Sequence, residues 1–150
     1  MTPIEEVILF QIDLTSKVSK QCAQRDFDRL ELGITVEQWV VLKIISEAPG
    51  ISQKELADKS FRDPASITRT LDLLEKKDLL RRDRIEENRR MYQLILTKQG
   101  IAFIKKNMEY VQAQRDKSTA DISTEELEQL SATLLKIRQN MQELFFYPYY

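Results

Sequence analysis

The 150-residue sequence contains no histidine and only one cysteine, Cys22. Without histidine, the chain cannot form a Ser-His-Asp triad, a histidine general base or a histidine-ligated metal site. A single cysteine cannot build a zinc cluster. The glycine-rich loops that hold nucleotide phosphates are also missing. These absences argue against an enzyme and predict no metal and no cofactor, with a small enzyme based on carboxylates alone as the least favoured alternative.

Glycine and proline are scarce too, at three and four residues, while 42% of the residues are hydrophobic. This composition is typical of a globular and strongly helical protein. No apolar run is long enough to span a bilayer, and the N-terminus lacks a basic-then-apolar signal pattern. We therefore expect a cytoplasmic protein with no membrane partner, and a length of 150 residues suits one domain.

The net charge of −1 is unevenly distributed along the chain. Between Ser52 and Lys105 there are thirteen Lys or Arg and nine Asp or Glu, so this segment carries +4 and the remainder −5. Binding to phosphates needs cations in the right place, and a basic central segment can supply them. The simpler alternative is that the charges only solvate a surface.

Two short capped helices are predicted inside this basic segment. Ser52-Gln53-Lys54-Glu55 has the S-x-x-E form of a capping box, so a helix should begin at Ser52. Asp63-Pro64 combines a capping aspartate with a proline suited to the first helical position, which predicts a second helix. Residues 59–62 leave room for only a tight turn between them. This order predicts a helix-turn-helix, whose second helix enters the major groove.

The 3.6-residue repeat orients the second helix. Its inward side should carry four apolar residues, Ile67, Leu71, Leu73 and Leu74, and its outward side Ala65, Ser66, Arg69, Asp72 and Lys76. Small residues near a helix N-terminus allow close approach to phosphates, which the N-terminal dipole attracts. Arg69 is long enough to reach a guanine edge.

A basic β-hairpin should follow over residues 79–96. Tyr92, Leu94 and Leu96 alternate onto one face, which the core would cover, and Arg89 and Arg90 at the tip stay in solvent. Such a tip can lie along a DNA backbone or a minor groove.

Helices are predicted on both sides of this module. Thr2-Pro3-Ile4-Glu5 is a capping box for a helix that should run into the Arg25 region, and Thr35 to Gln38 opens another that ends before Pro49-Gly50. A helix from Thr97 should reach about Lys117. After a further capping box at Ser123, a heptad seam is formed by Leu127, Leu130, Leu134, Ile137, Met141 and Leu144.

The chain resembles the MarR family of bacterial winged helix-turn-helix regulators in three segments. These are Thr35-Val36-Glu37-Gln38-Trp39 with Val40-Val41-Leu42, then Ser66-Ile67-Thr68-Arg69-Thr70-Leu71 with Leu74-Glu75-Lys76-Lys77, and finally Asn88-Arg89-Arg90 running to Leu94-Ile95-Leu96-Thr97-Lys98-Gln99-Gly100. The third segment departs from the family at Asn88, where an aspartate that helps to orient arginines usually stands.

The resemblance implies a mainly α fold with a small β-hairpin wing. It predicts a single domain over 1–150, with a winged helix-turn-helix module at about 35–100 and dimerisation helices at about 1–30 and 101–146. A homodimer would present two modules to successive major grooves, with half-sites about 34–36 Å apart or a multiple of that spacing. The alternative for the heptad seam is packing within one chain.

On this interpretation the protein is a sequence-specific DNA-binding regulator, and more a repressor than an activator. Ser66, Thr68 and Arg69 are expected in the groove, and Pro64 and Ala65 set the approach of the helix. The remaining expected contacts are Arg89 and Arg90 on the wing, and Ser52 and Gln53 at phosphates. A winged-helix protein-interaction module without DNA binding is the alternative, favoured by Asn88 and the acidic total charge.

Relatives in this family bind small, often aromatic effectors, and some sense peroxides through a cysteine on the first helix. Phe10, Trp39, Met108 and Tyr110 could line an effector pocket, although each is more simply interpreted as a core residue. A lone cysteine on an apolar helix is more often a small buried hydrophobe, so we assign Cys22 no role.

Overall fold

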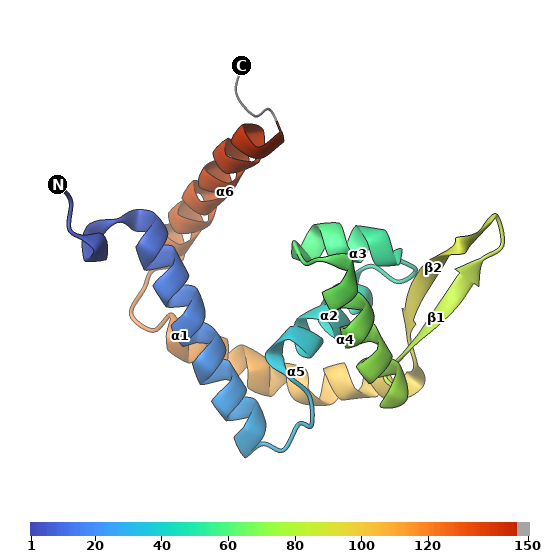
Figure 1. The fold of residues 1–150 in the computed structure, drawn as a ribbon. Helices are drawn as coiled ribbons and strands as arrows, with labels where there is room; N and C mark the ends of the chain where they lie inside the picture. Colours follow the sequence, from blue (N-terminus) through green and yellow to red (C-terminus); the bar gives the residue numbers. More distant parts are fainter. Residues whose placement is uncertain (147–150) are drawn as a thin grey trace. The chain divides into compact units, whose positions relative to one another are not determined.

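The structure is a computed structural model that describes residues 1–146, apart from the side chains of Arg89 and Phe146. Its contacts divide the chain into two units, Met1–Tyr110 and Val111–Tyr150. The elements in chain order are η1 (Ile4–Glu6), α1 (Ile8–Arg29), α2 (Val36–Glu47), α3 (Gln53–Ser60), α4 (Pro64–Lys76), β1 (Leu80–Ile85), β2 (Asn88–Leu96), α5 (Lys98–Ser118) and α6 (Thr124–Phe146), as labelled in Figure 1. The mainly α fold with a β-hairpin is thus confirmed.

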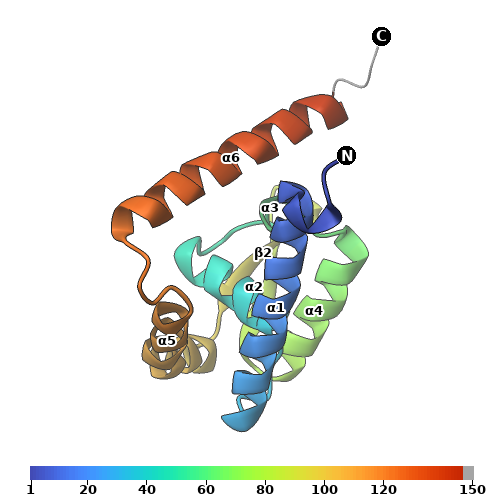
Figure 2. The same ribbon diagram turned by 90° about the vertical axis from the view of Figure 1, so that its left-hand side faces the viewer.

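The N-terminus differs from the sequence prediction. The capping box expected at Thr2 is wrong, because Pro3 precedes a short 3₁₀ helix without any side-chain cap. Val7 is extended, with φ −75° and ψ 119°, and interrupts the helical path, so α1 begins only at Ile8. α1 then continues to Arg29, beyond the expected end near Arg25, and packs against α2 (Figure 2).

α2 forms the centre of the first unit. Its capping box is complete, since Gln38 N–H donates to Thr35 Oγ1 at 3.2 Å and the Gln38 side chain accepts from Thr35 N–H at 3.0 Å. Trp39 is 1% exposed and its ring lies between Phe27 of α1 and Phe103 of α5, at centroid distances of 6.0 and 6.2 Å. The helix ends at Glu47, as expected ahead of Pro49-Gly50.

α3 and α4 form the predicted helix-turn-helix. Ser52 Oγ accepts from Glu55 N–H at 3.0 Å, and Asp63 Oδ1 accepts from Ser66 N–H at 2.9 Å, with Pro64 at the first position of α4. Ile67, Leu71 and Leu74 are buried as expected, but Leu73 is 47% exposed, so its inward assignment is wrong. Thr70 is buried in its place. Ile67, Thr70, Leu71 and Leu74 follow the i, i+3, i+4, i+7 spacing of one helix face, which leaves Leu73 on the flank.

The antiparallel hairpin of β1 and β2, which we call the wing, pairs Leu80 with Leu96 at its base and has a register irregularity after Arg84 near its tip. Leu94 and Leu96 are buried, while Tyr92 is only partly covered. At the base, Gly50 N–H donates to the Leu94 carbonyl and Leu94 N–H donates to the Ile51 carbonyl, so the segment before α3 joins the sheet edge. The wing lies beside α3 and α4 (Figure 1).

The start of α5 is packed tightly against the residue that precedes the wing. Thr97 Oγ1 accepts from Gly100 N–H at 3.0 Å and donates to the Asp78 carbonyl at 2.6 Å. A Cβ on Gly100 would lie 1.9 Å from the carbonyl oxygen of Leu79. Only glycine fits here, which gives the Leu-x-Leu-Thr-x-x-Gly sequence a structural reason.

The second unit contains the end of α5 and all of α6. Ser123 and Glu126 form a full capping box at the start of α6, because each accepts a hydrogen bond from the backbone of the other. The apolar heptad residues Leu130, Met141 and Leu144 are exposed in the single chain. Within the first unit, α1 likewise exposes Ile8, Leu9, Leu14 and Val18. None of the helices among residues 1–146 combines the length and apolar character needed to cross a bilayer.

Candidate nucleic-acid interface

The outward face of α4 begins with residues that allow close approach. Pro64 and Ala65 are exposed in the first turn, and Arg69 is exposed one turn later. The structure gives Arg69 no hydrogen bond or ion pair with any other residue between 1 and 146. Its guanidinium is therefore free to form a bidentate pair with an acceptor outside the chain.

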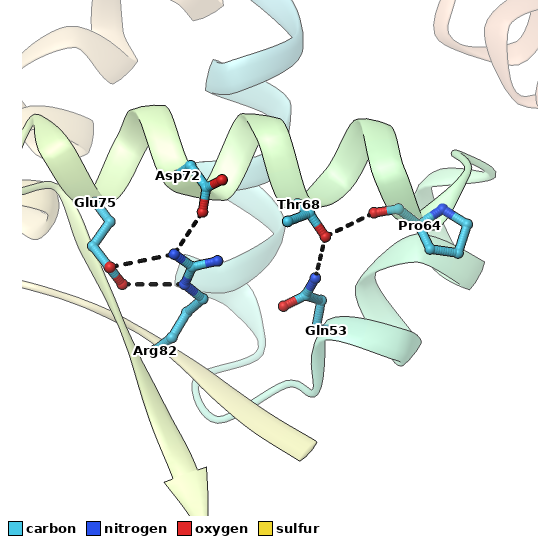
Figure 3. A network of polar contacts seen from close by, with 6 residues as sticks. All are labelled: Gln53, Pro64, Thr68, Asp72, Glu75 and Arg82. Carbon is cyan, nitrogen blue, oxygen red and sulfur yellow. Dashed lines mark hydrogen bonds and ion pairs between the residues drawn. The ribbon is translucent and has the colours of Figure 1, made fainter. Parts of the chain in front are cut away.

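Two predicted contact residues, Gln53 and Thr68, hydrogen-bond to each other. Gln53 Nε2 on α3 donates to Thr68 Oγ1 on α4 at 2.8 Å, and Thr68 Oγ1 donates to the Pro64 carbonyl at 3.0 Å (Figure 3). Both side chains are half-buried. These hydrogen bonds fix α3 against the start of α4, so the angle between the two helices depends on them.

Arg62, in the turn before α4, is a positioning residue that the sequence analysis missed. Its Nη2 donates to Ser66 Oγ at 2.5 Å and to Thr70 Oγ1 at 2.9 Å, while its buried Nη1 has no partner among the described residues. Ser66, which we expected in the groove, is thereby held by Arg62. Hydroxyls at 66 and 70, one turn apart, could have indicated an acceptor pair for this arginine.

An ion-pair network joins the wing to the opposite end of α4. Arg82 of β1 donates to Asp72 Oδ1 at 2.7 Å and to Glu75 Oε2 at 3.2 Å (Figure 3). The hydrogen bond with Glu75, and to a lesser degree that with Asp72, raises the pKa of Arg82 above its ordinary value, against the opposing effect of burial. The network holds the wing base at a fixed angle to α4.

The tip of the wing is organised around Asn88. Asn88 Oδ1 accepts from Arg90 N–H at 3.2 Å, so this amide closes the turn at the position where the family usually has an acid. Arg90 is exposed, and Arg84 lies over the Tyr92 ring at 5.7 Å from its centroid. Arg89 belongs to β2, but its side chain lies outside the described part of the chain.

Ser52, which we expected to contact phosphate, is buried. It is 4% exposed and its hydroxyl caps α3, while its backbone forms an isolated bridge with Gln93. The prediction treated the first residue of the helix-turn-helix as surface, but the sheet edge covers it. Gln53, the next residue, is half-buried and remains the more accessible of the two.

The first unit contains a pocket of about 500 Å³ between α2, the end of β2 and α5. Its walls are mainly aliphatic, with Lys43 and Lys105 among the lining residues. Of the four residues expected to line an effector pocket, Met108 lines this one, whereas Trp39 is enclosed in the core and Phe10 and Tyr110 are half-exposed elsewhere. Within residues 1–146 no cluster of acidic or thiol side chains could hold a metal ion.

Cys22 is exposed on α1, so the expectation of a buried thiol is wrong for the single chain. The apolar positions that suggested burial, such as Leu14 and Val18, are exposed along the same helix.

Comparisons with known proteins agree with this geometry. Residues 34–92 match the MarR family model. A MarR/EmrR family transcriptional regulator from Acinetobacter sp. ADP1 superimposes with a TM-score of 0.86 at 20% identity, covering 95% of this chain and 99% of that one. S. aureus MepR, solved as a DNA complex, has a TM-score of 0.76 at 24% identity, covering 88% of this chain and 96% of that one.

A third structure, Streptococcus pneumoniae FabT in complex with DNA, has a TM-score of 0.71 at 20% identity and covers 95% of this chain and 99% of that one. At these identities the structural likeness establishes the fold. Residues 34–92, which contain the helix-turn-helix and most of the wing, thus match the MarR family model, and the structural matches show that nearly the whole chain has the fold of these MarR-type proteins.

Proposed function

We propose that this protein is a homodimeric, sequence-specific DNA-binding regulator that acts in the cytoplasm as a repressor and is released by a small effector. The observation that carries the proposal is that Arg69 is exposed on the outward face of α4 and has no partner among the described residues. DNA complexes of MepR and FabT, which share the fold, support duplex DNA as the ligand.

The contact would begin at the N-terminus of α4. Its exposed first turn, with Pro64 and Ala65, lets the backbone approach the duplex, and the N-terminal end of the helix dipole favours phosphate. Arg69 would donate to O6 and N7 of a guanine in the major groove. Exposed Arg90 on the wing would contact the backbone, with Arg89 beside it in sequence.

Dimerisation is supported by the apolar side chains that single-chain folding leaves uncovered. α1 exposes Ile8, Leu14 and Val18, and α6 exposes Leu130, Met141 and Leu144. Such contiguous apolar faces on soluble proteins usually mark interfaces. In this proposal residues 1–30 and 101–146 form the dimer helices, and 35–100 form the DNA-binding module. Sedimentation velocity at micromolar concentration tests it, because a stable monomer would exclude the dimer.

Effector release would act through the spacing of the two α4 helices. A ligand that binds better to a dimer whose helices do not match the grooves lowers DNA affinity by that difference in binding free energy. A pocket bordered by α2, the wing base and α5 is a suitable place for such coupling. A panel of small phenolic acids, added to the protein–DNA complex, tests whether any of them lowers DNA affinity.

The direct test is binding to duplex DNA. Selection from a random-sequence pool should yield a pseudo-palindromic site, and its affinity should fall steeply with salt because bound lysines and arginines release counterions. The alternative, a winged protein-interaction module, has the net charge of −1 in its favour. If selection enriches no sequence and a random duplex does not bind at any salt concentration, that alternative is supported.

A further inference from the structure

Phe61, the residue that ends α3, has a left-handed backbone with φ 51° and ψ 44°. The turn requires this conformation. Phe61 N–H donates to the Asp58 carbonyl at 3.2 Å, and Arg62 N–H donates to the Ala57 carbonyl at 3.1 Å. These two bonds make a Schellman motif, in which the left-handed position is usually glycine. A bulky aromatic residue is strained there, so the backbone alone would favour glycine over Phe61.

Packing within the chain does not explain the phenylalanine either. Its side chain is 83% exposed, so the ring gains little from burial. The other non-glycine residues with positive φ in the described part of the chain are Glu31, Asp78 and Asp121, all polar. Non-glycine residues held in a strained backbone conformation cluster at functional sites. The ring of Phe61 is therefore available for a partner outside the chain.

The position of Phe61 indicates what that partner is. It lies two residues before Asp63, the N-cap of α4, and two residues after the exposed Lys59. A duplex that receives the start of α4 in its major groove brings its sugar-phosphate backbone to this turn, whose exposed charges are Asp58, Lys59 and Asp63. Beside the phosphates, DNA offers apolar C–H groups on its sugars and on the thymine methyl.

We propose that the ring of Phe61 packs against the apolar surface of duplex DNA at the edge of the groove that α4 enters. This inference rests on the proposed function. It makes Phe61 a DNA-contacting residue at a position where the backbone conformation favours glycine. The place of Phe61, directly before the helix that we propose to enter the groove, favours DNA over a second copy of the chain as the occupant.

Phe61→Gly separates the two effects of the residue. The glycine relieves the left-handed strain, so the midpoint of urea unfolding, followed by the fluorescence of Trp39, should rise. Affinity for the duplex that the wild type selects should nevertheless fall, by about threefold to tenfold in Kd. The salt dependence should stay unchanged, because no charge is removed. Phe61→Leu should keep most of the affinity, since it keeps an apolar side chain.

Glu31→Gly is the matched control, because Glu31 has φ 53° in a turn after α1 with the same pair of backbone hydrogen bonds, and it lies outside the residues proposed to bind DNA or to form the dimer helices. It should raise stability in the same way and leave DNA affinity unchanged. Replacing thymine by uracil in the selected duplex removes the methyl groups. If the difference between wild type and Phe61→Gly persists on this duplex, the ring contacts sugar, and if it vanishes, the ring contacts a methyl group.

Three results would overturn the inference. Full affinity of Phe61→Gly beside weakened binding of Arg69→Ala would remove Phe61 from the interface and leave the proposed function intact. A smaller dimer fraction of Phe61→Gly in sedimentation would assign the ring to a second copy. A wild type that binds no duplex would end both proposals.

Discussion

Arg82 on β1 is joined to Asp72 on α4 by a 2.7 Å ion pair, so the wing is fixed to the helix that we propose to enter DNA. The arginine side chain is only 20% exposed and also contacts Glu75. One guanidinium thus bridges two carboxylates on successive turns of α4. This network acts at the base of the wing and not at its tip, where Asn88 replaces the usual acid.

Replacing Arg82 with methionine should lower the free energy of unfolding by about 1–2 kcal/mol, because partly buried, charge-assisted hydrogen bonds are lost. DNA affinity should fall as well, since the wing loses its fixed angle. Urea unfolding and fluorescence anisotropy measure the two effects. Arg81→Met is the control, because the exposed Arg81 pairs only with Asp83, two residues away, among the described residues. Equal losses in both variants would contradict a special role for Arg82.

The stability that this network contributes should not change with pH near neutrality, because Arg82 stays protonated there. A base whose folded-state pKa is raised contributes stability below its unfolded pKa and loses it only as pH rises through the folded pKa. For Arg82 both values lie in the strongly alkaline range, because the hydrogen bond with Glu75 raises the pKa. The stability difference between wild type and Arg82→Met should therefore be constant between about pH 7 and pH 9. A steady decline over this range would contradict it.

Arg69→Ala should weaken binding to the selected site by about 1–3 kcal/mol if the side chain recognises a guanine. Binding to random duplex should change much less, and stability should not change, because Arg69 is exposed. Anisotropy titrations with both duplexes measure the difference. Lys76→Ala, at the far end of the same face, is the control and should leave the preference between the two duplexes intact.

Arg90→Ala should act uniformly on all sequences. A phosphate contact contributes about one unit to the slope of log K against log salt concentration, and its loss should lower the slope by that amount. Lys136→Ala is the control, because it removes an exposed cation of α6, outside the DNA-binding module, and should leave the slope unchanged. An unchanged slope for Arg90→Ala would place the wing tip away from the duplex.

Local signals in the sequence predicted much of this fold. The caps at Thr35, Asp63 and Ser123 depend only on residues within one turn, and all three form as expected. The Thr2 box does not form, because Pro3 and not Thr2 directly precedes the first helical turn, and the extended Val7 then separates that turn from α1. The capping pattern contains neither backbone choice.

The candidate site was less predictable, because its arrangement depends on contacts between elements. Gln53 with Thr68, and Arg82 with Asp72, are separated by fifteen and ten residues. Periodicity assigns a residue to a face of its own helix, but it does not say which side chain from another element will meet it. The cover over Ser52 has the same origin, since it comes from the edge of the wing.

Gly100→Ala tests the close approach of α5 to the backbone of Leu79. In an unobstructed helix this change is stabilising, because alanine has the higher helix propensity. Here the new Cβ would lie 1.9 Å from the Leu79 carbonyl oxygen, so α5 must move away from the base of the wing. We expect a loss of about 1–3 kcal/mol in the free energy of unfolding, as for other overpacked sites. Gln99→Ala, at the exposed neighbouring position, should stay within about 0.5 kcal/mol of wild type. A stabilised Gly100→Ala variant would show that α5 and Leu79 are not in contact, and would remove the steric reason for glycine at this position.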